Sequence, residues 1–425
     1  MNTRSKSGRG LLQLLTGTVG AQLLTFAALP LISRLYSPES FGQYSLVLSL
    51  AAIATPLATL RLESATLLPQ DSSHVRSITG VALGAILVIG VVYSGAVFAL
   101  SSFGVSGLNV SFGLAVWIFI FTVLMAVFEL LTRLTLRKKL YSTVATRTFL
   151  RSAATVAPQL GLSVGPAQAV PGLLIGALIG HLAGLGVMVK STKEFLCRPR
   201  LHDVRTVWRR YWRFPVVFAP SALLNAFGLQ LPLVFFIAHF GIGPGGQVGM
   251  ADKLISVPVT LVAATIGQVF AGEAADRIRS GGAGLNRLFL RFSALLAAGG
   301  LVVGVAAATL AESVLPWILG SQWTTAGMVV QTLALNAAIR LVASPLSQIL
   351  ILLEKSLLNT ILDVTRAVLM VISFSLVTAL SLSLTQATFL VYTAMAVTYF
   401  VTWVCCAVLA HKADPGKGKR VQLSQ

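Results

Sequence analysis

Arginine side chains inside long apolar segments are the groups in this sequence most able to do chemistry. Arg340 is the clearest case, because it lies about midway along an apolar run from Ala326 to Leu353. A charge at the centre of a membrane helix costs about 2.5 to 3.5 kcal/mol, so it usually faces a partner or a water-filled cavity. No acid lies within one helical turn of Arg340. We therefore expect Arg340 either to contact a ligand or to pair with an acid from another helix.

Two more arginine positions have informative spacing. Arg61 and Glu63 are two residues apart, and such neighbours point to different faces of a continuous helix, so we expect no direct pairing between them. Arg147 and Arg151 are four residues apart and should share one face. Two like charges on one face are unfavourable, so an anion or an acid is expected opposite them.

Three acids lie at membrane depth, and each has two possible roles. Glu63, Glu129 and Asp363 could couple transport to protons or sodium. Pairing within a helix is the alternative for Glu129 and Asp363, because Arg133 and Arg366 follow them at helical spacing. Both readings remain open from the sequence.

The balance of deep charges indicates what a cavity could bind. Three acids stand against five arginines at membrane depth: Arg61, Arg147, Arg151, Arg340 and Arg366. If these groups share a cavity, it is net cationic and suits an anion. Arginine forms bidentate hydrogen bonds with phosphate oxygens and stays charged in a low dielectric.

The elements that must position these residues are membrane helices. The chain of 425 residues is 56% hydrophobic and only 11% charged, and its mean hydropathy is +0.84. Apolar runs of about 20 residues, the length of a spanning helix, recur along the chain. An all-α integral membrane fold is therefore predicted, with about twelve spans at 11–33, 41–69, 76–101, 108–132, 143–162, 171–190, 214–239, 251–273, 288–311, 326–353, 356–380 and 385–410.

Lys and Arg alternate from one loop to the next, which predicts the orientation. The turns 101–110, 162–171, 240–250, 312–325 and 381–386 contain neither residue. Basic residues collect in the alternate loops and at both ends, including Arg4 and Lys417. Because loops rich in Lys and Arg stay in the cytoplasm, both termini are predicted to be cytoplasmic.

The longest connection predicts the domain organisation. It separates an N-terminal six-helix lobe, 1–190, from a C-terminal six-helix lobe with a basic tail, 214–425. The linker 191–213 places four apolar residues among arginines at near-helical spacing: Leu201, Val204, Trp208 and Tyr211. This pattern favours an amphipathic helix on an anionic membrane surface over a solvated basic loop.

Several classes of protein are not expected. Cys197, Cys405 and Cys406 form neither a disulfide framework nor a zinc motif, and no cofactor is implied. The net charge of +19 does not indicate nucleic-acid binding, because the basic residues lie between apolar runs. No phosphate-cradling Gly-rich loop occurs, and the outward turns are too short to hold a glycosyltransferase site, so an enzyme is not expected.

A segment near the N-terminus resembles a known family. The stretches 31–44, 60–65 and 67–69 are similar to Wzx-type O-antigen and polysaccharide flippases, which belong to the multidrug/oligosaccharidyl-lipid/polysaccharide exporter superfamily. Beyond about residue 69 the resemblance is one of layout. The family commonly has tyrosine where this chain has Leu62, so a role for that aromatic is in doubt.

The resemblance implies a function and a mechanism. It implies a V-shaped carrier with alternating access in the bacterial inner membrane. Its cargo would be an oligosaccharide linked to undecaprenyl diphosphate, moved to the periplasmic leaflet for O-antigen or exopolysaccharide assembly. Membrane lipids, a polysaccharide polymerase and chain-length proteins are the implied partners. Arg61 and Arg340 are the expected contacts to diphosphate or acidic sugars, assisted by Arg34, Arg147 and Arg151.

Two rival functions remain open. An ion-coupled drug or small-molecule antiporter of the same superfamily would be expected to place unpaired acids in its cavity. A scaffolding membrane protein would not need buried, unpaired arginines. The basic balance of the deep charges favours the flippase.

Overall fold

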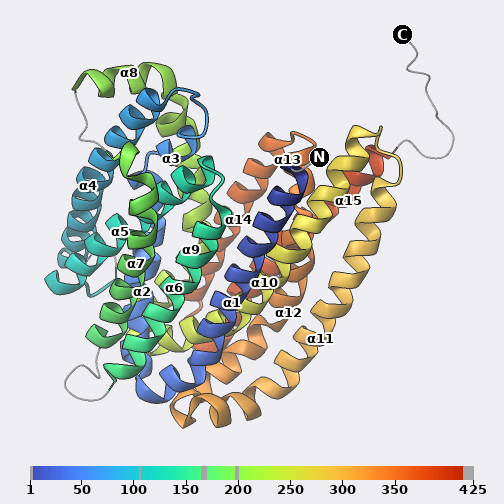
Figure 1. Ribbon diagram of the computed structural model, residues 1–425. Coiled ribbons are helices and arrows are strands. Elements are labelled where there is room, and N and C mark those ends of the chain that lie inside the picture. Colours follow the sequence, from blue (N-terminus) through green and yellow to red (C-terminus); the bar gives the residue numbers. More distant parts are fainter. Residues whose placement is uncertain (1–2, 105–106, 164–169, 197–200, 415–425) are drawn as a thin grey trace. The chain divides into compact units, whose positions relative to one another are not determined.

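The chain folds into helices throughout the part that the structure describes. The computed structural model describes residues 3–104, 107–163, 170–196 and 201–414 (Figure 1). No strand occurs within these ranges, so the predicted all-α fold is confirmed. Contacts divide the chain into two compact units, Met1–Gly249 and Met250–Gln425. The predicted lobe boundary within 191–213 stays a prediction.

The first unit contains seven long helices and several short ones. The long helices are α1 (Thr3–Leu35), α2 (Pro38–Ala58), α4 (Ser72–Ser102), α5 (Phe112–Arg137), α6 (Tyr141–Gly161), α7 (Val170–Thr192) and α9 (Ala219–Phe240). The short ones are α3 (Leu62–Ala65), η1 (Lys193–Phe195), α8 (Leu201–Tyr211) and the π-helical turn η2 (Phe214–Phe218). Within the unit, α2 packs against α5 and α9, and α6 packs against α1 and α7.

The second unit is built from the remaining helices. They are α10 (Ile242–Arg279, which begins in the first unit), α11 (Leu285–Leu319), η3 (Ser321–Trp323), α12 (Thr324–Leu346), α13 (Gln348–Leu352), α14 (Ser356–Ala379) and α15 (Leu384–Lys412). Here α12 packs against α11 and α15, and α14 also packs against α15.

Each of the twelve predicted spans falls on a long helix, and eleven helices of the described part are long and apolar enough to cross a membrane. The helix that falls short of this measure is α6, which carries Arg147 and Arg151. Two predicted spans are interrupted. The span 41–69 breaks after Ala58, and the span 326–353 breaks at Ser347.

Close packing of α6 on α7 depends on a glycine. Gly180 faces the backbone of α6, and a Cβ there would lie 2.6 Å from the carbonyl oxygen of Arg151 and would also collide with the Thr155 hydroxyl. Small residues at such interfaces let membrane helices approach closely. Gly180 thus fixes the distance between α7 and the helix that carries the arginine pair.

Gly180→Leu is expected to destabilise the first unit by at least about 1–3 kcal/mol, the usual cost of overpacking. Gly186→Leu on the same helix is the matched control, because no atom lies within 4 Å of a Cβ built at Gly186. Folded yield and apparent melting temperature in detergent measure the effect. Equal losses from both variants would contradict this role for Gly180.

Candidate functional site

A strained turn follows α2 and positions the first candidate arginine. Leu60 and Arg61 both have positive φ values, 51° and 54°. This left-handed conformation is costly for side chains other than glycine, and consecutive examples persist only where the surroundings hold them. The amide of Arg61 donates to Thr59 Oγ1 at 3.3 Å. The chain then enters α3 with Arg61 outside any helix.

The turn brings Arg61 and Glu63 together, so the expectation that they would not pair is wrong. Arg61 Nη1 lies 3.3 Å from Glu63 Oε1. The two-residue rule holds only for a continuous helix, and the left-handed turn breaks that helix between α2 and α3. Glu63 is 1% exposed, and its second oxygen, Oε2, has no hydrogen-bond partner.

The second pair, Arg147 and Arg151, shares one face of α6 as predicted. Both guanidinium groups lie over the ring of Phe128 from α5, at 4.1 Å and 5.1 Å from its centroid. Cation–π contact of this kind stabilises a cation away from water. Neither arginine forms an ion pair with an acid in the described part of the chain, and Arg147 Nε is buried without a hydrogen-bond partner.

A histidine on α7 orients Arg151. His181 Nδ1 lies 2.8 Å from the Ala177 carbonyl oxygen and must donate its hydrogen there. His181 Nε2 is then the acceptor for Arg151 Nη1 at 3.3 Å. The ring of His181 also packs edge-on against Phe128. His181 therefore fixes the direction of Arg151 without neutralising its charge.

These groups meet in one cavity of about 400 Å³ in the first unit. Five elements contribute charged or titratable side chains to it: the turn after α2, α3, α5, α6 and α7. Its lining consists of Ala52, Thr55, Pro56, Thr59, Arg61, Glu63, Met125, Phe128, Glu129, Arg151 and His181. Arg147 stacks on a wall of this cavity through Phe128.

The charged side chains that line the cavity balance one another, Arg61 and Arg151 against Glu63 and Glu129. Two arginines beside the lining, Arg133 and Arg147, add two positive charges. Glu129 pairs with Arg133 at 2.8 Å, which confirms the expected intrahelical pair, and Glu63 pairs with Arg61. Both acids at this site therefore have cationic partners. Arg147 and Arg151 remain as two positive charges without an ion-pair partner among the described residues. The region around the cavity therefore has a net positive charge, which suits an anion.

Arg340 belongs to a different cluster, in the second unit. Its Nη1 donates to Ser256 Oγ at 3.1 Å, and Ser256 Oγ donates to Asp252 Oδ1 at 3.1 Å. Asp252, on α10, interacts electrostatically with Arg340. Tyr392 of α15 interacts electrostatically with both charged groups. The expected alternative for Arg340, an acid from another helix, is therefore present as Asp252, through a bridging serine.

The remaining candidates lie elsewhere. Arg34 is exposed at the end of α1 and does not line the cavity. Asp363 pairs with Arg366 at 3.4 Å on α14, as its spacing allowed, and Arg366 stacks over Tyr399. Cys197 falls outside the described residues, while Cys405 and Cys406 are free thiols.

Sequence reasoning missed three contributors. His181 and Phe128 stand in apolar runs, where a single histidine or phenylalanine gives no signal of its own. Asp252 stands next to Lys253 at the expected start of a span, where a charge is usually an end marker. An inventory of all acids within five residues of a span would have included Asp252.

Comparison with known proteins now adds a family. Residues 31–329 match the family model described as "Polysaccharide biosynthesis protein", which is more than half of the chain. The chain belongs to this polysaccharide biosynthesis family. The match confirms the predicted relationship to a family of polysaccharide biosynthesis proteins. No curated protein matches the sequence.

Solved structures give this family member a transporter fold. Lipid II flippase MurJ in an inward closed conformation matches with a TM-score of 0.70 at 9% identity, over 95% of this chain and 88% of that one. An inward-facing MATE multidrug resistance transporter gives 0.57 at 13%, over 95% and 96%. A mutant of the Vibrio cholerae MATE transporter VcmN gives 0.57 at 10%, over 97% and 98%. At these identities the likeness establishes the fold alone.

One stretch that carries the family resemblance also contains the two consecutive left-handed non-glycine residues of the chain's described backbone. The stretch 60–65, which carries part of the family resemblance, contains both residues of the left-handed turn and the ion pair of Arg61 with Glu63. The turn places one member of the cavity lining immediately beside another. The motif therefore has a physical basis in the geometry of the cavity wall.

Proposed function

We propose that this polysaccharide biosynthesis protein is a flippase for oligosaccharides linked to undecaprenyl diphosphate. It moves them from the cytoplasmic to the periplasmic leaflet of the bacterial inner membrane, for O-antigen or exopolysaccharide assembly. Both termini lie in the cytoplasm. The observation that supports this proposal is the cavity in which Arg147 and Arg151 lack acidic partners among the described residues while Arg61 lies nearby.

A diphosphate is the ligand that this arrangement fits best. Arg151 presents a guanidinium fork fixed by His181, and Arg147 is stacked beside it on Phe128. Guanidinium forks match phosphate oxygens in geometry, and their attraction grows as the dielectric falls. The diphosphate would relieve the repulsion between the two like charges. Arg61 could join by exchanging Glu63 for a phosphate oxygen.

Two expected contacts have a weaker basis. Arg340 already donates to Ser256 beside Asp252, so contact with cargo would have to compete with that arrangement. Arg34 is exposed at the end of α1. We retain both as secondary candidates. Glu63, Glu129 and Asp363 remain candidates for coupling to protons or sodium, although each is paired with an arginine.

The rival function is a drug antiporter of the same fold. A site for organic cations would be expected to offer a carboxylate without a cationic partner, whereas Glu63 and Glu129 are both paired. The family match to polysaccharide biosynthesis also favours the flippase. Assembly with a polymerase and chain-length proteins is part of the proposal and rests on the family resemblance.

Deletion of the gene is expected to abolish the surface polysaccharide and to accumulate its lipid-linked precursor in the cytoplasmic leaflet. The precursor accumulates because synthesis continues on the inner face while transfer stops. Protection of the precursor from a membrane-impermeant glycosidase added outside spheroplasts measures its leaflet. Normal polysaccharide combined with hypersensitivity to cationic drugs would favour the antiporter.

A further inference from the structure

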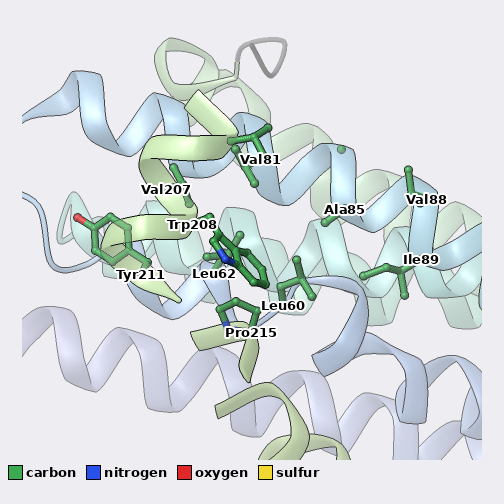
Figure 2. A pocket seen from close by; sticks show the side chains of 12 residues that line it. Leu60, Leu62, Val81, Ala85, Val88, Ile89, Val207, Trp208, Tyr211 and Pro215 are labelled. Carbon is green, nitrogen blue, oxygen red and sulfur yellow. The ribbon is translucent and has the colours of Figure 1, made fainter. Parts of the chain in front are cut away.

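A second cavity also borders the strained turn. It has a volume of about 390 Å³ and is lined by apolar side chains from the turn, α3, α4, α8 and the start of η2. Leu60 and Leu62, the two neighbours of Arg61, form part of its wall. Figure 2 shows the ring of Trp208 reaching from α8 toward Leu60 and Pro215. We refer to this cavity as the α4–α8 groove.

The groove exists because α8 docks on α4. Val207 and Tyr211 are buried in a hydrophobic core that also contains Leu62, Val75 and Ile78. Figure 1 shows α8 lying across one end of α4. Trp208 is 53% exposed, so the groove is open on one side. Two exposed arginines of α8, Arg205 and Arg209, directly follow the groove-lining residues Val204 and Trp208 and lie at the rim of the groove, and Arg210 is exposed beyond them.

The chemistry of the groove and its rim favours a lipid. The lining is almost entirely apolar, so a polar solute that entered would lose its hydrogen bonds with water and gain none from the protein. An alkyl chain makes no hydrogen bonds with water and can enter without this cost. Val88 lines the groove and is also exposed on α4, which is itself long and apolar enough to cross a membrane. The arginines on α8 supply the charge complement of an anionic headgroup.

We propose that the α4–α8 groove binds an acyl chain of an anionic membrane phospholipid. The chain lies against Leu60, Leu62 and Trp208, and the phosphate is held by Arg205 and Arg209. Lipid binding does not depend on the proposed flippase activity. Leu60 and Leu62 flank Arg61, so a lipid in the groove supports the strained turn that holds Arg61 at the first cavity. The effect of this support on transport rests on the proposed flippase function.

Native mass spectrometry of the full chain in detergent tests the binding. Phosphatidylglycerol, phosphatidylcholine and undecaprenyl phosphate are added in equal amounts. Wild type is expected to retain phosphatidylglycerol at least fivefold more than phosphatidylcholine. Ala85→Phe fills the groove and should lower that retention at least fivefold. Leu87→Phe is the matched control on α4, because Leu87 is exposed and does not line the groove.

Three results would overturn the proposal. Equal retention of phosphatidylcholine would show unspecific lipid binding, and preferred retention of undecaprenyl phosphate would assign the groove to a cargo tail. Unchanged retention in Ala85→Phe would place the lipid elsewhere. If Ala85→Phe does not fold, the double variant Arg205→Gln, Arg209→Gln tests the proposal instead, because both arginines are exposed. It is expected to lower phosphatidylglycerol retention at least threefold, and unchanged retention would overturn the proposal. The deletion phenotype described above tests the flippase separately.

Discussion

Replacing both Arg147 and Arg151 by glutamine is expected to reduce translocation of lipid-linked oligosaccharide about 100-fold or more. A hydrogen bond to a charged group contributes about 1.5–3 kcal/mol, so losing two such groups removes at least about 3 kcal/mol of binding to an anion. Both side chains stack on Phe128, and Arg151 is oriented by His181. Appearance of fluorescently labelled lipid-linked oligosaccharide in the outer leaflet of proteoliposomes measures the rate.

The control must separate this site from the general positive charge of the protein. Lys139→Gln removes one exposed charge from a neighbouring loop and should leave the rate unchanged. The double variant with lysine at 147 and 151 keeps the charge but loses the fork and should retain partial activity. The double glutamine variant also relieves repulsion between like charges, so its folded yield should not fall. A wild-type translocation rate in the double glutamine variant would show that Arg147 and Arg151 have no role in transport.

The arginine pair illustrates what the sequence could predict about the site. Four-residue spacing placed Arg147 and Arg151 on one face, and both lie over the same ring. The spacing could not name that ring, because Phe128 comes from α5 and is one of 22 phenylalanines. Long-range partners of this kind depend on how helices pack. Within one helix, spacing is a sufficient guide, as the pairs of Glu129 with Arg133 and Asp363 with Arg366 show.

The turn after α2 illustrates the opposite case. All predicted spans fall on long helices because apolar length alone determines where a chain can cross a bilayer. The break at Leu60 and Arg61 was not predicted, since neither glycine nor proline occupies the turn itself. Its left-handed geometry is imposed by packing, which includes Leu62 in the core beneath α8. Tertiary contacts therefore override local preference where the cavity is formed.

The second large effect is expected from the partly buried cluster of Asp252, Ser256 and Arg340 in the second unit. Asp252→Asn should lower the free energy of unfolding by about 1.5–3 kcal/mol, because it removes the acid that Ser256 links to the charge of Arg340. Arg340→Gln should cost a similar amount for the opposite reason. The double variant should recover most of this loss, since no uncompensated charge remains. Apparent melting temperatures of all three variants in detergent, compared as a double-mutant cycle, measure the coupling.

Transport by the double variant then separates the two roles open to Arg340. If Arg340 serves only to compensate Asp252, restoring stability should restore translocation as well. If Arg340 also contacts the diphosphate, the double variant should be stable but slow. Glu354→Gln is the matched control for loss of an acid, because Glu354 is exposed in the turn after α13. Additive losses in the double variant would show that Asp252 and Arg340 are not coupled, and the arginine would again be a free candidate for the cargo.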